Sequence, residues 1–307
     1  FGGTLQGSRS LNEVKEILED SAISKVGNDL KSIIKRLKRD ANIDLKGRLY
    51  DIGIMHYILN PEASHTTDSI LDEIFSNYAE PKPAQLYLFA KESLIKSLGN
   101  KIDLYCNIEM PLIHTLANME LTGVKIDKGF LKQMSGELTL EMHTIENRAR
   151  ALAEDPTLNL ASSKQVGILL FEKIKIDPNV KKSAKGNYHT NEQTLQQLQG
   201  KHPIVEQIME FRNYKKLLST YIDALPELID ATTGKIHTTF TQALTATGRL
   251  SSINPNLQNI PIRTQRGREI RKAFIPSFAN GYIVSADYSQ IELRLMAHFS
   301  QDEGLID

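Results

Sequence analysis

The sequence predicts a multidomain protein in which an α/β part is followed by an all-helical part and then by a second part that contains strands. In the first hundred residues, short apolar runs alternate with amphipathic segments, which is typical of an α/β arrangement. In the middle of the chain, apolar residues recur every three or four positions, which predicts long helices. Near the end, β-forming residues lead into an aspartate and an amphipathic segment. A chain of 307 residues is long enough for two or three domains.

The composition is that of a globular protein. Apolar residues make up 40% of the chain, and no apolar run reaches the ~18 to 20 residues of a membrane span. Cys106 is the single cysteine, which excludes an intrachain disulfide and a thiolate zinc site. The start lacks the basic-then-apolar order of a signal peptide, so we expect a cytoplasmic protein without membrane contact. Because the first residue is Phe1, we expect the chain to be a piece of a longer protein.

The first hundred residues carry signals for both helices and strands. Ser10 and Glu13 fit a capping box, in which the two side chains satisfy free backbone N–H groups at a helix start. Residues 23–26 predict a short strand, and residues 30–37 predict a basic amphipathic helix. The apolar run at 49–59 predicts a longer helix, because an asparagine and a proline follow it as stop signals.

The middle of the chain predicts helices throughout. Gly123 marks a helix end or turn, and the apolar positions of residues 130–152 describe one face of a long helix. Core packing explains those apolar residues fully. Two further capping boxes, beginning at Ser162 and Thr190, predict short helices. Pro203 opens another helix, whose apolar pattern a second proline stops.

The stretch from Gly281 to Ser300 combines a predicted strand, an aspartate and a predicted helix. Residues 282–284 are β-formers and predict a buried strand, and Ser289 with Glu292 predicts a capping box at a helix start. Asp287 would then lie at the carboxyl end of a strand, where a hard cation such as Mg²⁺ would suit it. For an isolated aspartate after a strand, a turn or capping role is the commoner one. The expected packed face of the helix is Ile291, Leu295, His298 and Phe299.

Two long segments resemble the family A DNA polymerases. DYSQIELR, from Asp287, resembles motif A of that family, and TATGRLSSINPNLQNIPIR, from Thr245, resembles the palm segment before it. NIEMPLIHTLANMELTGVKID matches the family's entry into palm and thumb. The resemblance implies three domains: a partial ribonuclease H-like 3′-5′ exonuclease-like domain (1–100), the palm entry with an all-helical thumb (101–234), and the first part of the polymerase palm (235–307).

The implied chemistry is nucleotidyl transfer to a primer 3′-hydroxyl with two Mg²⁺ ions. The resemblance implies that the carboxylate of Asp287 and the backbone carbonyl of Tyr288 bind metal. Glu292 fills the space that a ribose 2′-hydroxyl would need, and Gln290 and Tyr288 join it in nucleotide selection. The family's fingers and second acidic motif would follow Asp307, so we expect the 307-residue chain to be incomplete as an enzyme.

The implied partners are primer–template DNA and deoxynucleoside triphosphates, and a monomer is expected. Arg249 lies where the family reaches the minor groove at the primer end, although a surface charge or cap partner is its commoner role. For the NLASSKQ segment, a serine cap alone accounts for the local pattern. The other DNA contacts that the resemblance implies are Gln258, Asn259, Asn159, Ser162, Ser163, Lys164, Gln165, Arg212, Lys215, Arg263 and Arg294.

The resemblance also implies that the exonuclease-like chemistry is lost. Ile33 and Lys91 stand where active family members have metal-binding carboxylates, and a protonated lysine cannot bind Mg²⁺. Asp29, Asp51 and Glu92 are nearby carboxylates, but they are out of register. We therefore expect no working exonuclease.

Charge is balanced over the chain, with 37 basic and 37 acidic residues, but it is unevenly distributed. Six basic residues oppose one acidic residue in 245–275, and six oppose two in 159–188. Solvated faces carry such clusters too; phosphate binding becomes a hypothesis because both fall in segments that resemble DNA-contacting parts of the family. Two functions remain open: a DNA polymerase represented by part of its sequence, and a catalytically incomplete fragment that binds duplex DNA. A third hypothesis, an interaction scaffold, would give neither basic cluster a function.

Overall fold

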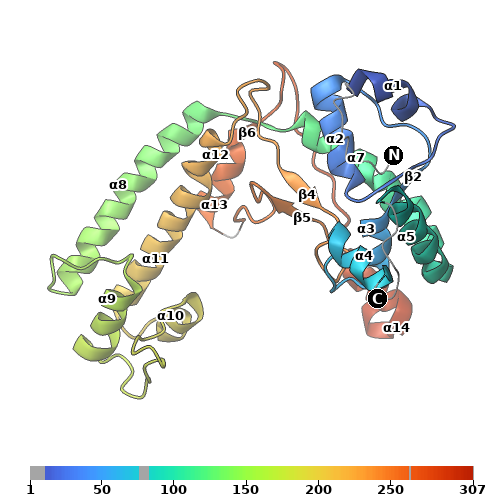
Figure 1. Cartoon of the computed structure of the whole chain (residues 1–307). Coiled ribbons are helices and arrows are strands. Elements are labelled where there is room, and N and C mark those ends of the chain that lie inside the picture. The colour runs from blue at the N-terminus through green and yellow to red at the C-terminus, as the bar shows by residue number, and fades with distance from the viewer. Residues whose placement is uncertain (1–10, 76–82, 263, 307) are drawn as a thin grey trace.

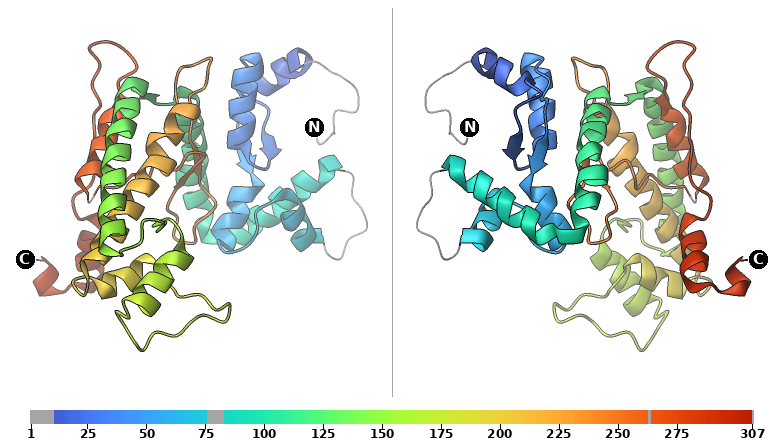
Figure 2. Two further views of the ribbon diagram at one scale, coloured as in Figure 1. Left: turned by 90° about the vertical axis from the view of Figure 1, so that its left-hand side faces the viewer. Right: turned by 90° about the vertical axis from the view of Figure 1, so that its right-hand side faces the viewer.

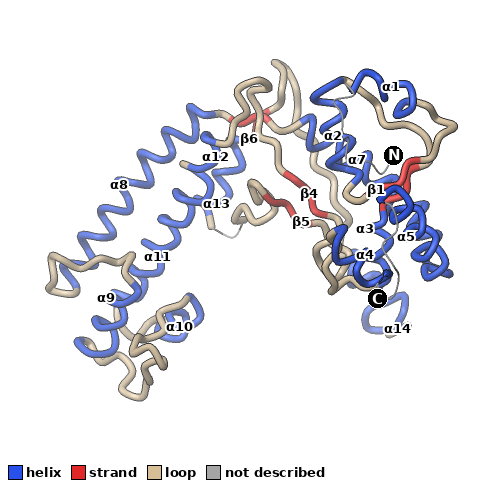
Figure 3. Tube along the Cα trace, in the orientation of Figure 1, coloured by secondary structure: helices blue, strands red, loops and turns tan. Residues whose placement is uncertain are grey.

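The computed structural model describes residues 11–75, 83–262 and 264–306, and it is mostly helical with a few short strands (Figures 1 and 3). Two long helices lie at one side of the molecule and the N-terminal elements lie at the other, with the paired strands β4 and β5 between them (Figure 1). Within the described ranges, no helix is long and apolar enough to cross a membrane.

A parallel pair of strands organises the N-terminal part. Strand β1 (Lys25–Gly27) pairs with β2 (Leu49–Asp51) in the register Lys25 to Leu49. The strand predicted at 23–26 begins two residues later than expected, at Lys25. The helix predicted at 49–59 begins only at Ile52. The first three residues of that run extend instead, because they can pair with β1 while Asp51 caps the following helix. The capping serine predicted at Ser10 lies outside the described residues.

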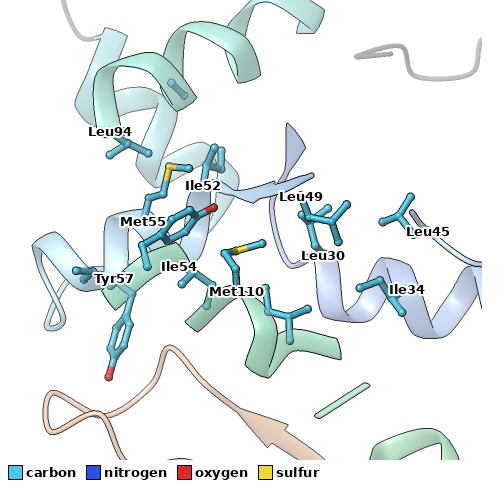
Figure 4. Close-up of a cluster of buried hydrophobic side chains, with 14 of the residues drawn as sticks. Leu30, Ile34, Leu45, Leu49, Ile52, Ile54, Met55, Tyr57, Leu94 and Met110 are labelled. Carbon is cyan, nitrogen blue, oxygen red and sulfur yellow. The ribbon is translucent and has the colours of Figure 1, made fainter. Parts of the chain in front are cut away.

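The N-terminal helices enclose one hydrophobic core, called here the first cluster. Leu30, Ile52, Met55, Leu94 and Met110 are among its buried side chains (Figure 4). The predicted basic helix forms as α2. The helices and turns of this part are α1 (Leu11–Glu19), α2 (Leu30–Ala41), α3 (Ile52–Leu59), α4 (Thr67–Phe75), α5 (Pro83–Leu98), η1 (Gly99–Lys101), α6 (Ile102–Leu104), η2 (Tyr105–Glu109) and α7 (Met110–Thr122).

Two long helices, α8 (Lys128–Leu152) and α11 (Pro203–Leu217), pack side by side (Figures 1 and 2). Most of the apolar stripe predicted for the first of them is buried, with Leu131 and Leu138 fully covered, but Leu152 at its end is 42% exposed. Pro203 is the first residue of α11, as predicted, because its missing N–H costs nothing there. The chain then winds on through η4 (Leu218–Ile222) and α12 (Ala224–Glu227).

Short helices close the far end of this pair and form a second core there. Ser162 caps α9 (Ser163–Ile168) as predicted, with its hydroxyl accepting from the Gln165 N–H at 3.3 Å. The capping box predicted at Thr190 is wrong. Asn191 caps α10 (Glu192–Leu198) instead, because Thr190 is buried and its oxygens accept from another helix. The remaining turn is η3 (Leu169–Lys173).

The C-terminal part contains two pairs of short strands, and residues of one pair share a hydrophobic core with the start of α8 and the end of α11. Antiparallel β4 (Thr239–Thr241) and β5 (Ser251–Ile253) form one hairpin. Strand β3 (Lys125–Ile126) pairs with β6 (Phe274–Ile275), next to α13 (Gln265–Ile270) and η5 (Arg271–Ala273). Gly123 ends α7 with φ 62°, and a Cβ there would lie 2.8 Å from the Ile236 carbonyl oxygen, so glycine is required.

The last segment departs most from the sequence prediction. Residues 282–284 form no strand, and Tyr282 and Val284 are 89% and 88% exposed, because no described strand pairs with them. Helix α14 (Ile291–Ser300) begins after Gln290 with no side-chain cap, so the predicted Ser289–Glu292 capping box is wrong. Gln290 has φ 51°, and this left-handed turn carries Ser289 away from the helix start.

The face predicted to be packed on α14 is exposed in this chain. Ala297 is the buried residue of the helix, whereas Ile291, Leu295 and Phe299 are 39%, 48% and 80% exposed. The helix packs against α15 (Glu303–Ile306) and stands clear of the N-terminal elements in the views of Figure 2.

Candidate functional site

Asp287 lies on an exposed loop that leads from β6 into α14. Two and four residues upstream, Ser285 and Ile283 line a cavity of about 860 Å³ whose other wall includes Gly123 and Phe240. The carboxylate therefore lies just beyond the strands of the C-terminal part, accessible to solvent. Neighbouring Tyr288 is 81% exposed.

The structure brings together two residues that the sequence predicted separately. Arg249, on the turn between β4 and β5, donates from Nη2 to Oε1 of Glu292, in the first turn of α14, at 3.2 Å. Both side chains are about three-quarters exposed, at 76% and 75%. Such an exposed pair contributes little free energy, so either group can exchange this partner for a ligand.

Arg294 and Gln290 shape the turn that precedes α14. The Nε of Arg294 donates to the Ser289 carbonyl oxygen at 3.0 Å, which fixes the guanidinium on the turn. Arg294 thus holds the backbone two residues after Asp287, and its side chain is exposed. Gln290 gives the turn its left-handed conformation.

Gln258 turns its side-chain amide inward. Its Oε1 accepts from the Ser252 N–H at 2.9 Å, and its Nε2 donates to the Leu250 carbonyl at 3.2 Å. These bonds use both ends of the amide to fasten the segment after β5. Asn259 is exposed, and its carbonyl accepts from the Tyr221 hydroxyl at 2.6 Å.

The NLASSKQ loop uses several of its polar groups internally. Asn159 Oδ1 accepts from the Ala161 N–H at 2.9 Å, and Gln165 Oε1 accepts from the Asn159 N–H at 2.8 Å. Asn159, Ser163, Lys164 and Gln165 are all exposed. With Ser162 serving as the helix cap, Ser163 and Lys164 are the polar members whose side chains these internal bonds do not use.

Arg212 and Lys215 lie on the same helix but differ in surroundings. Arg212 donates from Nη2 to Thr190 Oγ1 at 3.2 Å and from Nη1 to the Thr190 carbonyl, which ties α11 to the start of α10. Burial lowers the pKa of this guanidinium. Lys215 is exposed and is the better placed of the two for a phosphate. Arg263 lies outside the described residues.

The basic cluster of residues 245–275 is partly neutralised by the fold. Arg266 meets the carboxylates of Glu137, Glu141 and Glu269, which raises the pKa of the guanidinium above its usual range. It thereby joins α13 to α8. Arg271 donates to the Ile260 carbonyl at 3.2 Å.

In the N-terminal part, two of the three carboxylates near the expected exonuclease ligand positions, Asp29 and Asp51, serve as helix caps. Asp51 is 2% exposed and accepts from the N–H groups of Gly53, Ile54 and Leu30. Burial raises the pKa of Asp51 to about 6. Asp29 caps α2, and the Lys91 ammonium lies 5.1 Å from the centroid of the Tyr50 ring. Over the described ranges, no group of three or more His, Cys, Asp or Glu side chains is arranged to hold a metal.

Sequence reasoning missed the buried carboxylate that joins the N-terminal part to β4. Glu120, on α7, accepts from Lys31 Nζ at 2.5 Å, from Lys35 Nζ, and from the Phe240 N–H at 2.8 Å. Its side chain is fully buried. The signal was present: Glu120 follows Leu116 and Ala117 at helical spacing and so lies on the apolar face of α7.

As a metal ligand, Asp287 offers the right donor type but an incomplete set. An exposed carboxylate and the backbone carbonyl next to it are oxygen donors, which Mg²⁺ prefers. Among the residues that the structure describes, Asp287 belongs to no group of three or more His, Cys, Asp or Glu side chains that could hold a metal. These residues can provide one side of a metal site.

Comparison with known proteins identifies the family. Residues 128–307 match the sequence model of DNA polymerase family A, and the chain therefore belongs to this family. It is 39% identical to the DNA polymerase I of Synechocystis sp. over 95% of this chain, and 39% identical to that of Bacillus subtilis over the same share. The chain spans about a third of the length of these relatives, 32% and 36%.

The fold is similar to a solved polymerase. The polymerase domain of Pol1 from M. smegmatis, in complex with a DNA primer–template and dNTP, aligns with a TM-score of 0.82 at 33% sequence identity. The alignment covers 96% of this chain and 53% of that one. The arrangement of helices and strands described above is therefore that of a family A polymerase domain.

Proposed function

We propose that this chain belongs to a template-directed DNA polymerase, in which it binds primer–template DNA and supplies one metal-binding carboxylate of the active site. One observation carries the proposal. Asp287 is an exposed carboxylate on the turn before α14, within the segment that matches family A, and Glu292 on that helix pairs with Arg249 from the hairpin turn.

The proposed domain roles follow the packing of the chain. Residues 1–100 make an exonuclease-like, ribonuclease H-like domain without catalytic carboxylates, supported by the parallel β1–β2 pair and by Ile33 and Lys91 at the expected ligand positions. Residues 101–234 make the palm entry and thumb, supported by the paired helices α8 and α11. Residues 235–307 make the first part of the palm.

Asp287 and the Tyr288 carbonyl would hold Mg²⁺ together with ligands from elsewhere in the protein. Two bound ions would lower the pKa of the primer 3′-hydroxyl and stabilise the charge on the leaving pyrophosphate. Glu292 limits the space beside the sugar of the incoming deoxynucleoside triphosphate, with Gln290 and Tyr288 forming the turn beneath it. We propose a monomeric, cytoplasmic enzyme.

Among the proposed DNA contacts, the exposed cations carry most of the attraction for phosphate. Lys164 and Lys215 lie on the α8–α11 side, and Arg249 lies on the hairpin turn. Arg212 and Gln258 have internal partners. We therefore propose that they stabilise the neighbouring residues that contact DNA. Because such contacts go to the backbone or to the minor groove, they bind DNA of any sequence.

Asp287→Ala in the full-length polymerase tests the proposal. We expect nucleotide incorporation to fall by about three orders of magnitude or more, because the proposed metal-binding carboxylate is lost. Affinity for primer–template should stay within about twofold, since it depends on the cations. Glu303→Ala is the matched control: it removes an exposed carboxylate at the start of α15, beyond the far end of α14. Primer extension by Asp287→Ala at close to the wild-type rate would rule out the metal role.

A second candidate function is duplex DNA binding by this segment without catalysis. The exposed Lys164 and Lys215 favour it, because both are presented by helices that fold within this chain. Primer extension and DNA binding by the 307-residue chain, measured side by side, distinguish the two functions. Salt-dependent binding without extension supports the second.

A further inference from the structure

The hairpin that carries Arg249 is attached to the N-terminal part at three successive points. The Phe240 carbonyl accepts from Lys31, and the Phe240 N–H donates to Glu120 at 2.8 Å. Gln242, two residues on, donates from Nε2 to Glu109 Oε2 at 2.5 Å. The third point is the carbonyl of Thr245, which accepts from the Tyr57 hydroxyl at 2.6 Å. The edge of β4 and the chain beyond it are thus held by side chains far away in sequence.

The third point is the one closest to Arg249. Thr245 Oγ1 donates to the Arg249 carbonyl at 2.8 Å, and the Gly248 N–H donates to the Thr245 carbonyl at 3.4 Å. Thr245 therefore fixes the backbone of Arg249 across the turn. Gly248 has φ 79°, which only a glycine adopts without strain.

Tyr57 is a rigid support for this turn. Its side chain is 5% exposed and belongs to the first cluster, with Ile54 and Ile58 of the same helix buried beside it. Figure 4 shows its ring leaving the cluster, with the hydroxyl directed at the loop of the C-terminal part. A tyrosine packed in this way has lost its rotamer freedom, so the hydroxyl holds its acceptor at a fixed place.

We propose that Tyr57 is a positioning residue for Arg249: through Thr245, the exonuclease-like part fixes the turn that presents this guanidinium to the primer end. The inference rests on the proposed function of Arg249 as a DNA contact. It gives the exonuclease-like part a role in polymerisation that needs no catalytic carboxylate. The proposed positioning of Arg249 depends on the Tyr57 hydroxyl. This hydroxyl can be removed without changing the packing of the core.

The test uses the 307-residue chain with Tyr57→Phe, which deletes the hydroxyl alone. Tyr105→Phe is the matched control, because Tyr105 is 1% exposed in the same cluster and its hydroxyl accepts from the Asp51 N–H at 2.9 Å, away from the turn. Amide hydrogen exchange of a peptide covering 243–251 is measured by mass spectrometry. We expect exchange in this peptide to accelerate about threefold to tenfold in Tyr57→Phe and to stay at the wild-type rate in Tyr105→Phe.

The coupling to Arg249 is measured with a fluorescent duplex that has a recessed primer 3′ end. Tyr57→Phe should weaken binding about threefold in the wild-type background and leave affinity unchanged in the Arg249→Ala background, as expected for a residue that acts through another. An equal loss in both backgrounds would overturn the proposal, and so would unchanged exchange in 243–251. If Arg249→Ala itself leaves affinity unchanged, the proposed DNA contact is wrong, and hydrogen exchange alone then decides whether Tyr57 fixes the turn.

Discussion

At the scale of single residues, two exposed side chains with separate expected roles pair with each other. Glu292 pairs with Arg249 at 3.2 Å, although the sequence predicts one for sugar selection and the other for the primer end. Both are exposed, so the pair is held by a weak attraction. We infer that the pair keeps the two side chains near their working positions until DNA and nucleotide replace it.

Glu292→Ala in the full-length polymerase tests the sugar-selection role. We expect discrimination against ribonucleotides to fall roughly 10- to 100-fold, because the space for a 2′-hydroxyl opens, with a smaller effect on deoxynucleotide addition. The midpoint of thermal unfolding should hardly change, since Glu292 caps no helix and its ion pair is exposed. Steady-state incorporation of paired ribo- and deoxynucleotides measures the ratio.

Glu292→Gln is the control, because it keeps the size of the side chain and removes its charge. It should retain most of the discrimination. Full sugar discrimination in Glu292→Ala would show that the side chain only balances the charge of Arg249.

At the scale of elements, one buried carboxylate joins two helices and a strand. Glu120 of α7 accepts from Lys31 and Lys35 of α2 and from the backbone of β4. Two ammonium groups around one buried carboxylate are stable only while all the hydrogen bonds are made. This cluster therefore determines how the N-terminal part is seated on the hairpin.

Glu120→Gln should lower the free energy of unfolding by about 3 kcal/mol, because the two ammonium groups lose their counter-charge in a buried site. Chemical denaturation of the 307-residue chain measures the change. Glu172→Gln is the comparison: Glu172 pairs with Lys182 at 2.9 Å on the surface, and its loss should cost less than about 1 kcal/mol. Equal effects of the two changes would contradict the assignment of Glu120 as a buried link.

At the scale of the whole molecule, the N-terminal part, for which we propose an exonuclease-like fold without catalytic carboxylates, uses its polar side chains for internal contacts. Asp29 and Asp51 cap α2 and α3, and Lys91 lies over the ring of Tyr50. These contacts stabilise the part as a support, and through Tyr57 and Glu120 it reaches the hairpin of the C-terminal part.

We predict that neither this chain nor the longer protein removes nucleotides from a DNA 3′ end. Single-stranded DNA labelled at its 5′ end, incubated with Mg²⁺ or Mn²⁺, should keep its length, because Ile33 and Lys91 cannot bind the metals. Robust shortening would show that the loss of carboxylates is not decisive. If it also persisted after changing Asp29, Asp51 and Glu92, the site would lie elsewhere.

Local sequence patterns were enough to predict the helices and caps that depend only on neighbouring residues. The apolar stripe of 130–152, the serine cap at 162 and the glycine at 123 each predicted what forms, because helix periodicity and cap chemistry act within a few residues. The family, too, was evident from two segments of the sequence, and the comparisons confirm it.

Only the tertiary structure decided features that depend on distant partners. Residues 49–51 became a strand because β1 lies beside them, and 282–284 remained extended and exposed because no described strand does. Thr190 accepts a hydrogen bond from Arg212 and does not cap the helix as predicted. The Gln258 side chain bonds to the backbone of β5. The contacts of Tyr57 with Thr245 and of Glu120 with Phe240 span more than a hundred residues each. No local pattern encodes them, because burial and hydrogen-bond partners are set by what packs against a segment and not by the segment itself.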